Sequence, residues 1–171
     1  MYDVLILVSE QKKAIYLNMD DIVLLPMNKK STDRKKFYFE IWPYINNVSG
    51  ILYKIFTKRG FGEFECGDDL FDFDYSQNIP QNQCVPYFFS NDFDMIKDDL
   101  DSLSINSLYK KTFFDIMRLL ISKSPIHTLI FLCRGQSNEK EILLGKISLD
   151  NFFELLMNGQ VFTNVCYIIG E

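Results

Sequence analysis

Carboxylates and aromatic rings crowd one short stretch of the sequence, residues 60–78, which reads GFGEFECGDDLFDFDYSQN. The stretch holds six carboxylates and five aromatic rings, and it contains no Lys or Arg. Closely spaced carboxylates can bind a metal ion, take part in an enzyme active site or attract a cationic partner. Their spacing, and the elements that carry them, decide among these three kinds of chemistry.

A metal site is the first possibility, because Asp68, Asp69 and Asp72 form the sequence DDLFD, which matches a DDxxD metal-diphosphate box. That box requires carboxylates on one face of a helix, three or four residues apart. The alternation of residue types here indicates a strand instead. The EF-hand pattern also fails, since its Gly and its terminal Glu are missing at the required positions. We therefore expect no metal and no cofactor.

Nucleophilic chemistry would have to use the cysteines and the single histidine, which are Cys66, Cys84, Cys133, Cys166 and His127. The cysteines form no CxxC pair, and no local signature supports a Cys–His pair. Cys133 and Cys166 lie in apolar runs, where cysteine behaves as a small hydrophobic residue. We interpret His127 as a strand-end residue. GxxxxGK[ST], GxGxxG and GxSxG are all absent, so the sequence predicts a protein that is not an enzyme.

The net charge of −5 is distributed unevenly along the chain. Residues 61–101 carry one Lys and eleven Asp or Glu, a net charge of −10, whereas the segments before and after carry +4 and +1. This acidity disfavours nucleic-acid binding, and the basic run 29–36 is interpreted as a solvated loop. A segregated negative charge favours a basic protein as partner, with an ordinary solvated face as the alternative.

Residues 63–75 are expected to form an acidic β-hairpin that positions these carboxylates. Aromatic or apolar residues alternate with acidic ones on both sides of Gly67-Asp68-Asp69, which supplies turn chemistry. The rings would face the core and the carboxylates would face water. A helix over 92–103 would add carboxylates that lie mostly off its buried stripe. The expected partner-binding residues are Glu63, Glu65, Asp68, Asp69, Asp72, Asp74, Asp94, Asp98 and Asp101.

The remaining pattern predicts an α/β (mixed α+β) fold in a single domain over residues 1–171. It would have a central mixed sheet, the acidic β-hairpin and about three to four helices. The expected strands are 3–9, 37–42, 128–133, 141–145 and 161–169, and the expected helices are 92–103, 107–123 and 149–158. Residues 14–25 suggest a hairpin, or a strand plus an edge, that ends at Pro26. Residues 45–57 stay ambiguous between helix and strand.

No run approaches the roughly 20 apolar residues that span a bilayer, and no signal peptide is recognisable. We therefore expect no membrane contact, a cytoplasmic location and reduced thiols.

The final segment reads EKEILLGKISLDNFFELLMNGQVFTNVCYIIGE, residues 139–171. Its order of strand, short helix with paired Phe, Gly and a strand ending in YII resembles immunity proteins of bacterial polymorphic toxin systems, including those of contact-dependent growth inhibition. The resemblance implies a protein that binds one cognate toxin, often a nuclease, and blocks its active site. It assigns no particular residue, because such families diverge at their binding surfaces.

Together these observations predict a non-catalytic immunity protein that holds a basic toxin through carboxylates. Two other classes stay open. One is a small enzyme whose site is assembled from scattered residues such as Asp68, Asp72 or Cys84, which bound metal or inactivation by a thiol reagent would reveal. The other is a structural subunit that oligomerises through exposed Phe and Tyr, which light scattering would reveal.

Overall fold

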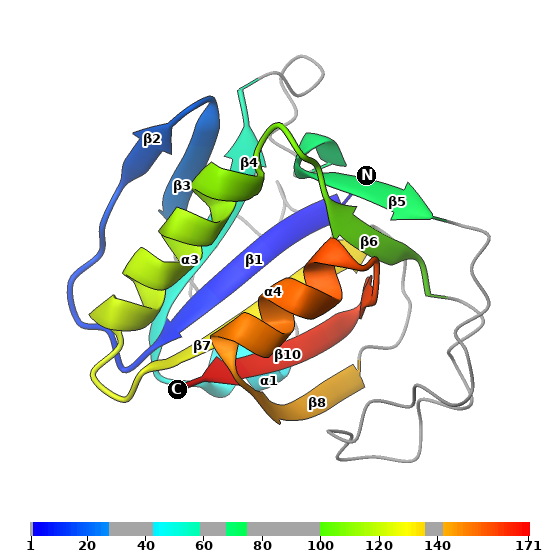
Figure 1. Cartoon of the computed structure of the whole chain (residues 1–171). Coiled ribbons are helices and arrows are strands. Elements are labelled where there is room, and N and C mark those ends of the chain that lie inside the picture. The colour runs from blue at the N-terminus through cyan, green and yellow to red at the C-terminus, as the bar shows by residue number, and fades with distance from the viewer. Residues whose placement is uncertain (1, 28–42, 59–67, 75–99, 136–141) are drawn as a thin grey trace.

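The first strand, β1 (Tyr2–Ser9), lies at the centre of the main sheet in this structure, a computed structural model that describes residues 2–27, 43–58, 68–74, 100–135 and 142–171 (Figure 1). Val4 to Val8 are all buried. β1 pairs antiparallel with β4 (Gly50–Thr57) on one side and with β7 (Thr128–Gly135) on the other. A central strand with both faces covered has no polar side, which is why its sequence is a continuous apolar run.

The sheet continues on both sides of this centre. Within the described residues it has seven strands in the order β2-β3-β4-β1-β7-β10-β8. The outer strands are β2 (Leu17–Met19), β3 (Ile22–Met27), β10 (Val165–Gly170) and β8 (Ile142–Ile147). All neighbours are antiparallel except β10 and β8, which are parallel. The central mixed sheet predicted from the sequence is therefore confirmed.

Two helices, α3 (Lys110–Lys123) and α4 (Leu149–Met157), cover one face of the sheet, and the short α1 (Pro43–Asn47) lies behind it (Figure 1). Phe114 of α3 and Phe153 of α4 stack with ring centroids 3.9 Å apart, which joins the two helices. α3 and α4 are the two substantial helices of the described residues. The mixed α+β class agrees with the prediction, but the expected three to four helices are not borne out.

A second, smaller sheet contains the acidic stretch. Its described strands are β5 (Phe71–Asp74), β6 (Ser102–Ile105) and β9 (Val161–Phe162), in that order. Asp68 and Asp69, expected in a turn, belong to the 3₁₀ helix η2 (Asp68–Leu70). Residues 63–66, the other strand of the expected hairpin, lie outside the described residues. In the part of the chain that is described, β5 pairs with β6.

The predicted helix over 92–103 is wrong at its end, because Ser102 and Leu103 belong to strand β6. The part at 92–99 lies outside the described residues. The spacing of Leu100 and Leu103 suggested a helical stripe, and both side chains are indeed buried. Leu103, however, belongs to a strand that lies between β5 and β9, and its side chain packs in the main hydrophobic core. An apolar spacing of three residues over so short a run does not distinguish a helix from a strand.

The predicted strand over 161–169 is also corrected, because it divides into β9 and β10, which belong to different sheets. Asn164, at the division, has a left-handed backbone with φ 58°. Its N–H donates to the Cys133 carbonyl at 2.8 Å, and its Oδ1 accepts from the Gly135 N–H at 3.0 Å. Asn tolerates this conformation better than most residues, so the chain turns here within an otherwise strand-like sequence.

Near the N-terminus, β2 and β3 form a hairpin around Asp20 and Asp21, which have φ of 46° and 68°. A hairpin is one of the two arrangements expected for residues 14–25, but its first strand begins only at Leu17. Two successive left-handed residues are typical of a type I′ hairpin turn. The strand does not end before Pro26, as predicted, but continues through it to Met27. β2 pairs with β3 only as far as Leu24, so at Pro26 strand β3 pairs with β4 alone. A proline, which has no N–H to donate, is tolerated at such an edge position.

The ambiguous residues 45–57 contain the end of α1 and then β4. Gly50, at the start of β4, has φ 140°, and a Cβ there would lie 2.1 Å from the Val8 carbonyl oxygen. Only glycine fits this close approach. The expected strand at 37–42 and the basic run at 29–36 lie outside the described residues.

In the C-terminal half, α3, β7 and α4 follow the sequence pattern closely. β7 begins at Thr128 as expected, and α3 ends at Lys123 but begins three residues later than predicted. α4 begins after Ser148, whose Oγ accepts from the Asn151 N–H at 3.2 Å as an N-cap. No helix among the described residues has the length and apolar character needed to cross a membrane.

Candidate functional site

The outer face of the β5–β6 ribbon brings two of the predicted carboxylates together. Asp72 is opposite Ser104 and Asp74 is opposite Ser102 in the antiparallel register. Because side chains alternate along a strand, these four residues share one face of the ribbon. Asp72 is exposed and Asp74 is half-buried. The sequence alternation therefore predicted the outward direction of both carboxylates correctly.

The opposite face of the ribbon attaches it to the rest of the fold. Phe71 is buried and meets the rings of Phe113 and Phe131 edge-on, at centroid distances of 5.5 Å and 6.1 Å. Phe73 stacks on Tyr2 at 4.2 Å. These contacts join β5 to α3, β7 and β1, and so they hold the two carboxylates in place.

A hollow of about 260 Å³ lies on the acidic face, between the ribbon and the end of α4. The described residues that line it are Asp72, Asp74, Ser102, Ser104, Met157, Asn158 and Gly159. Figure 1 shows the upper end of α4 beside β6. Gly159, with φ 64°, ends the helix in the left-handed conformation that the sequence predicted for it. Sequence alone gave no sign that α4 would meet the acidic strand.

The electrostatics of this hollow are negative from two sources. The carboxylates of Asp72 and Asp74 are the first source. The second is the C-terminus of α4, because a helix carries a partial negative charge at that end. No basic residue lies in the last turn of α4 to offset it. The hollow therefore favours a positively charged group.

Two other predicted carboxylates lie apart from the described lining of the hollow and have internal hydrogen-bond partners. The Asp101 carboxylate accepts a hydrogen bond from the Tyr2 hydroxyl. The backbone N–H of Asp101 donates to Thr163 Oγ1 at 3.1 Å, and its carbonyl accepts from the Thr163 N–H at 2.9 Å. Asp69 Oδ2 accepts from Thr57 Oγ1 at 3.3 Å. Both acids connect elements of the fold. The side chains of Glu63, Glu65, Asp68, Asp94 and Asp98 lie outside the described part of the structure.

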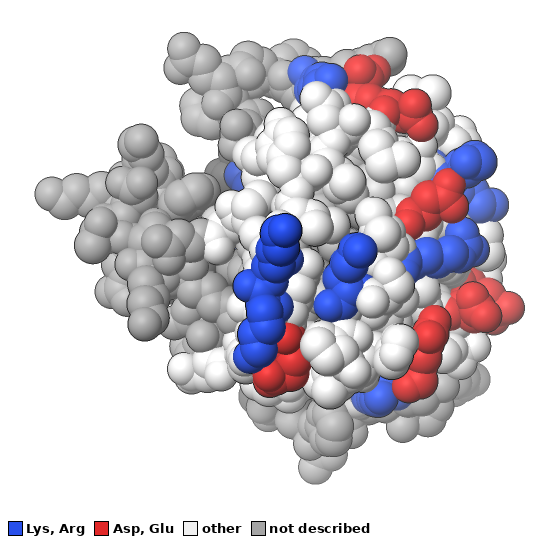
Figure 2. Space-filling model, turned by 90° about the vertical axis from the view of Figure 1, so that its left-hand side faces the viewer, with Lys and Arg blue, Asp and Glu red and all other residues white. Residues whose placement is uncertain are grey.

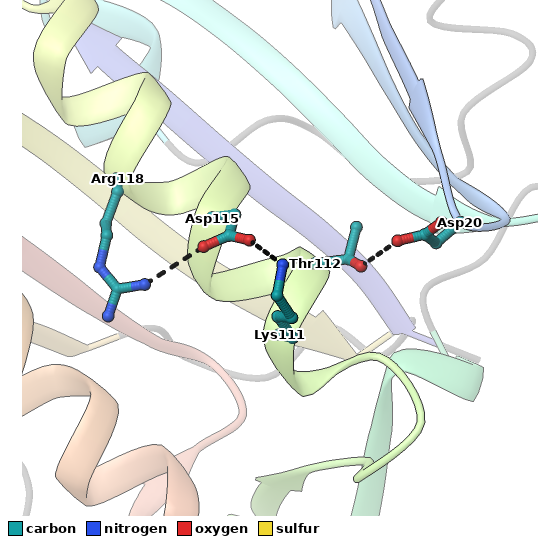
Figure 3. A network of polar contacts seen from close by, with 5 residues as sticks. All are labelled: Asp20, Lys111, Thr112, Asp115 and Arg118. Atoms are coloured by element: carbon teal, nitrogen blue, oxygen red, sulfur yellow. Dashed lines mark hydrogen bonds and ion pairs between the residues drawn. The ribbon is translucent and has the colours of Figure 1, made fainter.

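The α3 side of the molecule carries charge of both signs. Figure 2, which views the molecule from the β2 side, shows Lys or Arg next to Asp or Glu. Lys111 Nζ lies 2.9 Å from Asp115 Oδ2, and Arg118 is 3.3 Å from Asp115 Oδ1 (Figure 3). The hydrogen bond from Lys111 lowers the pKa of Asp115. Thr112 Oγ1 donates to Asp20 Oδ2 at 2.6 Å, which ties α3 to the β2–β3 turn.

The candidate nucleophiles that the structure describes do not gather at the hollow. Cys133 and Cys166 are buried, and they pack in separate hydrophobic clusters. His127 is exposed at the start of β7, and its Nδ1 lies 3.9 Å from Glu171 Oε2. Cys66 and Cys84 lie outside the described residues. Among the residues that the structure describes, no three His, Cys, Asp or Glu side chains are grouped so as to hold a metal ion.

Comparison with known protein families, curated proteins and solved structures gives no match to this chain.

Proposed function

We propose that this protein is a non-catalytic inhibitor of the immunity type, which binds and neutralises a cognate toxin domain with a basic surface. One observation carries the proposal. Asp72 and Asp74 face outward beside the negative end of α4, within the segment whose net charge is −10. Such an arrangement is suited to holding positive charge.

A basic toxin domain that handles nucleic acid has a positive cleft for phosphate groups. Carboxylates on a second protein can occupy that cleft and exclude the nucleic acid. Complementary charge also speeds the encounter of the two proteins and excludes wrong partners. The acidic ribbon would therefore act as a substitute for the phosphates of the toxin's substrate.

Binding explains the lining of the hollow better than proton transfer does. Beside the two carboxylates, its described lining contains two serines, a methionine, an asparagine and a glycine. None of these is a base or an acid that titrates near neutral pH. Carboxylates among neutral groups are suited to attracting a cation.

The first test is co-expression with a toxin domain, taken from a toxin reading frame directly upstream of this gene. The protein should relieve the growth arrest that the toxin causes. The double variant Asp72→Lys/Asp74→Lys should relieve it poorly. If the intact protein gives no relief, the immunity function is rejected.

The second test measures association with the purified toxin domain by stopped flow at two salt concentrations. We expect the double reversal to slow association by about tenfold or more at low salt, and salt to slow the intact protein as well. The matched control is Asp150→Lys/Glu154→Lys, which changes the net charge equally on exposed positions of α4. Equal rates for all three proteins, insensitive to salt, would contradict an electrostatic interface.

A further inference from the structure

We propose that the edge of the main sheet at β2 pairs with the same edge of a second copy of this chain, which gives a weak antiparallel dimer with twofold symmetry. β2 is the last described strand on its side of the sheet, and within the described part of the chain it pairs with β3 alone (Figure 1). Such an edge presents backbone N–H and C=O groups that another strand can bind. The inference goes beyond the proposed inhibitor function, because the acidic hollow involves the small sheet.

The sequence along this edge carries opposite charges at its two ends. It reads KKAIYLNMDD, residues 12–21, so two lysines precede β2 and two aspartates follow it in the turn to β3. Lysines alone on an edge oppose pairing between copies. Here an antiparallel copy places its aspartates beside these lysines and its lysines beside these aspartates. A parallel copy would place like charges together, so the charge pattern selects the antiparallel arrangement.

The hairpin turn determines which backbone groups face the open edge. Met19 and Ile22 flank a two-residue turn, so they form a hydrogen-bonded pair across the hairpin. Bonded and non-bonded pairs alternate along an antiparallel ladder, so the N–H and C=O of Asn18 point away from β3. By the same alternation, the backbone groups of Tyr16 point outward as well.

A register with Leu17 opposite Leu17 satisfies both the backbone and the charges. It pairs Asn18 of one copy with Tyr16 of the other, so that outward-facing backbone groups meet. It also places Lys13 opposite Asp21, because each lies four positions from Leu17. Twofold symmetry makes every such contact twice and occupies both edges, so the assembly closes at two copies.

Hydrogen bonds hold the lysine end of the edge against the sheet. The Tyr53 hydroxyl accepts from the Ile15 N–H at 3.1 Å and donates to Gln11 Oε1 at 2.8 Å. Gln11 Nε2 in turn donates to the Lys13 carbonyl at 2.9 Å. Tyr53 and Gln11 are both buried, so this network fixes the backbone that carries the lysines. The edge is thus ordered before a second copy arrives, which lowers the entropic cost of pairing.

Contacts within the chain leave these charges able to attract a second copy. Lys12 Nζ lies 3.8 Å from Glu10 Oε2, and both side chains are exposed, so this pair contributes little by itself. Asp20 Oδ2 accepts from Thr112 Oγ1 at 2.6 Å. A carboxylate has about four lone-pair sites, so the bond from Thr112 does not prevent a lysine from binding as well.

The middle of the edge is apolar and exposed. Tyr16 is 60% exposed and Met19 is 41% exposed, and they are two of the five large hydrophobic residues that are exposed in the described part of the chain. In the proposed register, Met19 lies opposite Ile15 of the other copy, so pairing covers apolar surface. Figure 2 views the molecule from this side and shows uncharged atoms between acidic atoms near its top and basic atoms near its centre.

The test is sedimentation equilibrium of the full-length protein, with NMR of the ¹⁵N-labelled protein on dilution. We expect a monomer–dimer equilibrium with a dissociation constant of about 0.1 mM, because so short an edge covers less surface than a stable dimer interface. Salt should weaken the dimer. The amide signals of residues 12–21 should shift on dilution. A monomer up to about tenfold above that concentration, or assemblies larger than two copies, would overturn the proposal.

Two variants locate the interface. Lys13→Glu should weaken the dimer by about tenfold, because it replaces two attractive pairs with two repulsive ones. Its matched control is Lys146→Glu, which changes the net charge equally on β8, at the far end of the strand order, and should leave the affinity unchanged. Asn18→Pro removes an outward N–H without removing a bond to β3, and should abolish the dimer. Dimers of equal strength in wild type and Lys13→Glu would contradict this interface.

Discussion

The α3 face carries charged groups of both signs, whereas the described charged residues that line the acidic hollow are all carboxylates. On α3, Asp115 has Lys111 and Arg118 as partners within the same helix. In the hollow, Asp72 and Asp74 stand beside a helix end of the same sign, and no Lys or Arg is among the described lining residues. Balanced charge on a surface keeps it solvated and contributes little else. Concentrated charge of one sign opposes folding slightly and can attract a partner, which is why the hollow is the surface that we propose for partner binding.

The largest expected effect concerns the attachment of the acidic ribbon to the core. Phe71→Ala should destabilise the protein by about 3–5 kcal/mol, because a fully buried ring leaves a cavity between α3 and β7. Urea denaturation followed by circular dichroism measures this change. Leu108→Ala, at a position that is 65% exposed, is the control and should be nearly neutral. A loss below about 1 kcal/mol for Phe71→Ala would mean that the ribbon does not depend on this anchor.

Asn164→Ala should have the next largest effect. It removes the acceptor for the Gly135 N–H and places an alanine at positive φ, with an expected loss of about 2–3 kcal/mol. Asn164→Gly separates the two causes, because glycine accepts the backbone conformation and loses only the hydrogen bond. Thermal unfolding should rank the proteins as wild type, then glycine, then alanine. An alanine variant as stable as the glycine variant would show that backbone strain is absent.

Removing charge from the hollow should have a smaller effect with the opposite sign. Asp72→Asn should raise the free energy of unfolding by a few tenths of a kcal/mol, because it relieves repulsion between like charges. Asp150→Asn should lower it slightly, since that carboxylate lies at the positive end of α4. Denaturation at low and high salt, where screening should reduce both changes, tests the comparison directly. If Asp72→Asn and Asp150→Asn lower the free energy of unfolding equally, the carboxylate of Asp72 is not repelled by its surroundings, and this prediction is wrong.

The smallest expected effect on stability comes from the ion pairs of Asp115 with Lys111 and Arg118 on α3. The hydrogen bond from Lys111 lowers the pKa of Asp115 below the ordinary value of an aspartate. A lowered carboxylate pKa stabilises the folded protein above the unfolded pKa, and this contribution is lost as the pH falls through the folded pKa. Asp115→Asn should therefore have a slightly lower melting temperature than wild type at pH 7 and the same one near pH 2, relative to Lys123→Gln as an exposed control. A difference in melting temperature that grows as the pH falls would contradict this prediction.

The local pattern of the sequence carried information about single elements. The apolar runs of β1 and β7 predicted central strands, and the Phe–Asp alternation of β5 predicted which side chains face water. Ser148 and Gly159 predicted where α4 begins and ends, because caps act through neighbouring residues. These features depend on interactions within a few positions of the chain.

Pairing between distant segments could not be predicted in this way. Ser102 and Leu103, the first two residues of β6, were expected in a helix because the positions of Leu100 and Leu103 fit both structures. Only pairing with β5 and β9 decides between them. The hollow likewise depends on contacts between segments that are far apart in the sequence. Asp74 and Gly159 are 85 positions apart in the sequence, and nothing local to either indicates that they share a surface. The acidic strand was thus predictable, whereas the site that it forms was not.

The crossing of the chain from β9 to β10 at Asn164 has a consequence for recognition. Only Thr163 and Asn164 separate the two sheets along the chain, and the backbones of both residues are hydrogen-bonded, one to Asp101 and the other to β7. So short and firmly held a connection leaves the small sheet little freedom to tilt. A partner should then meet a surface that already has its bound shape, so that docking involves little loss of conformational entropy.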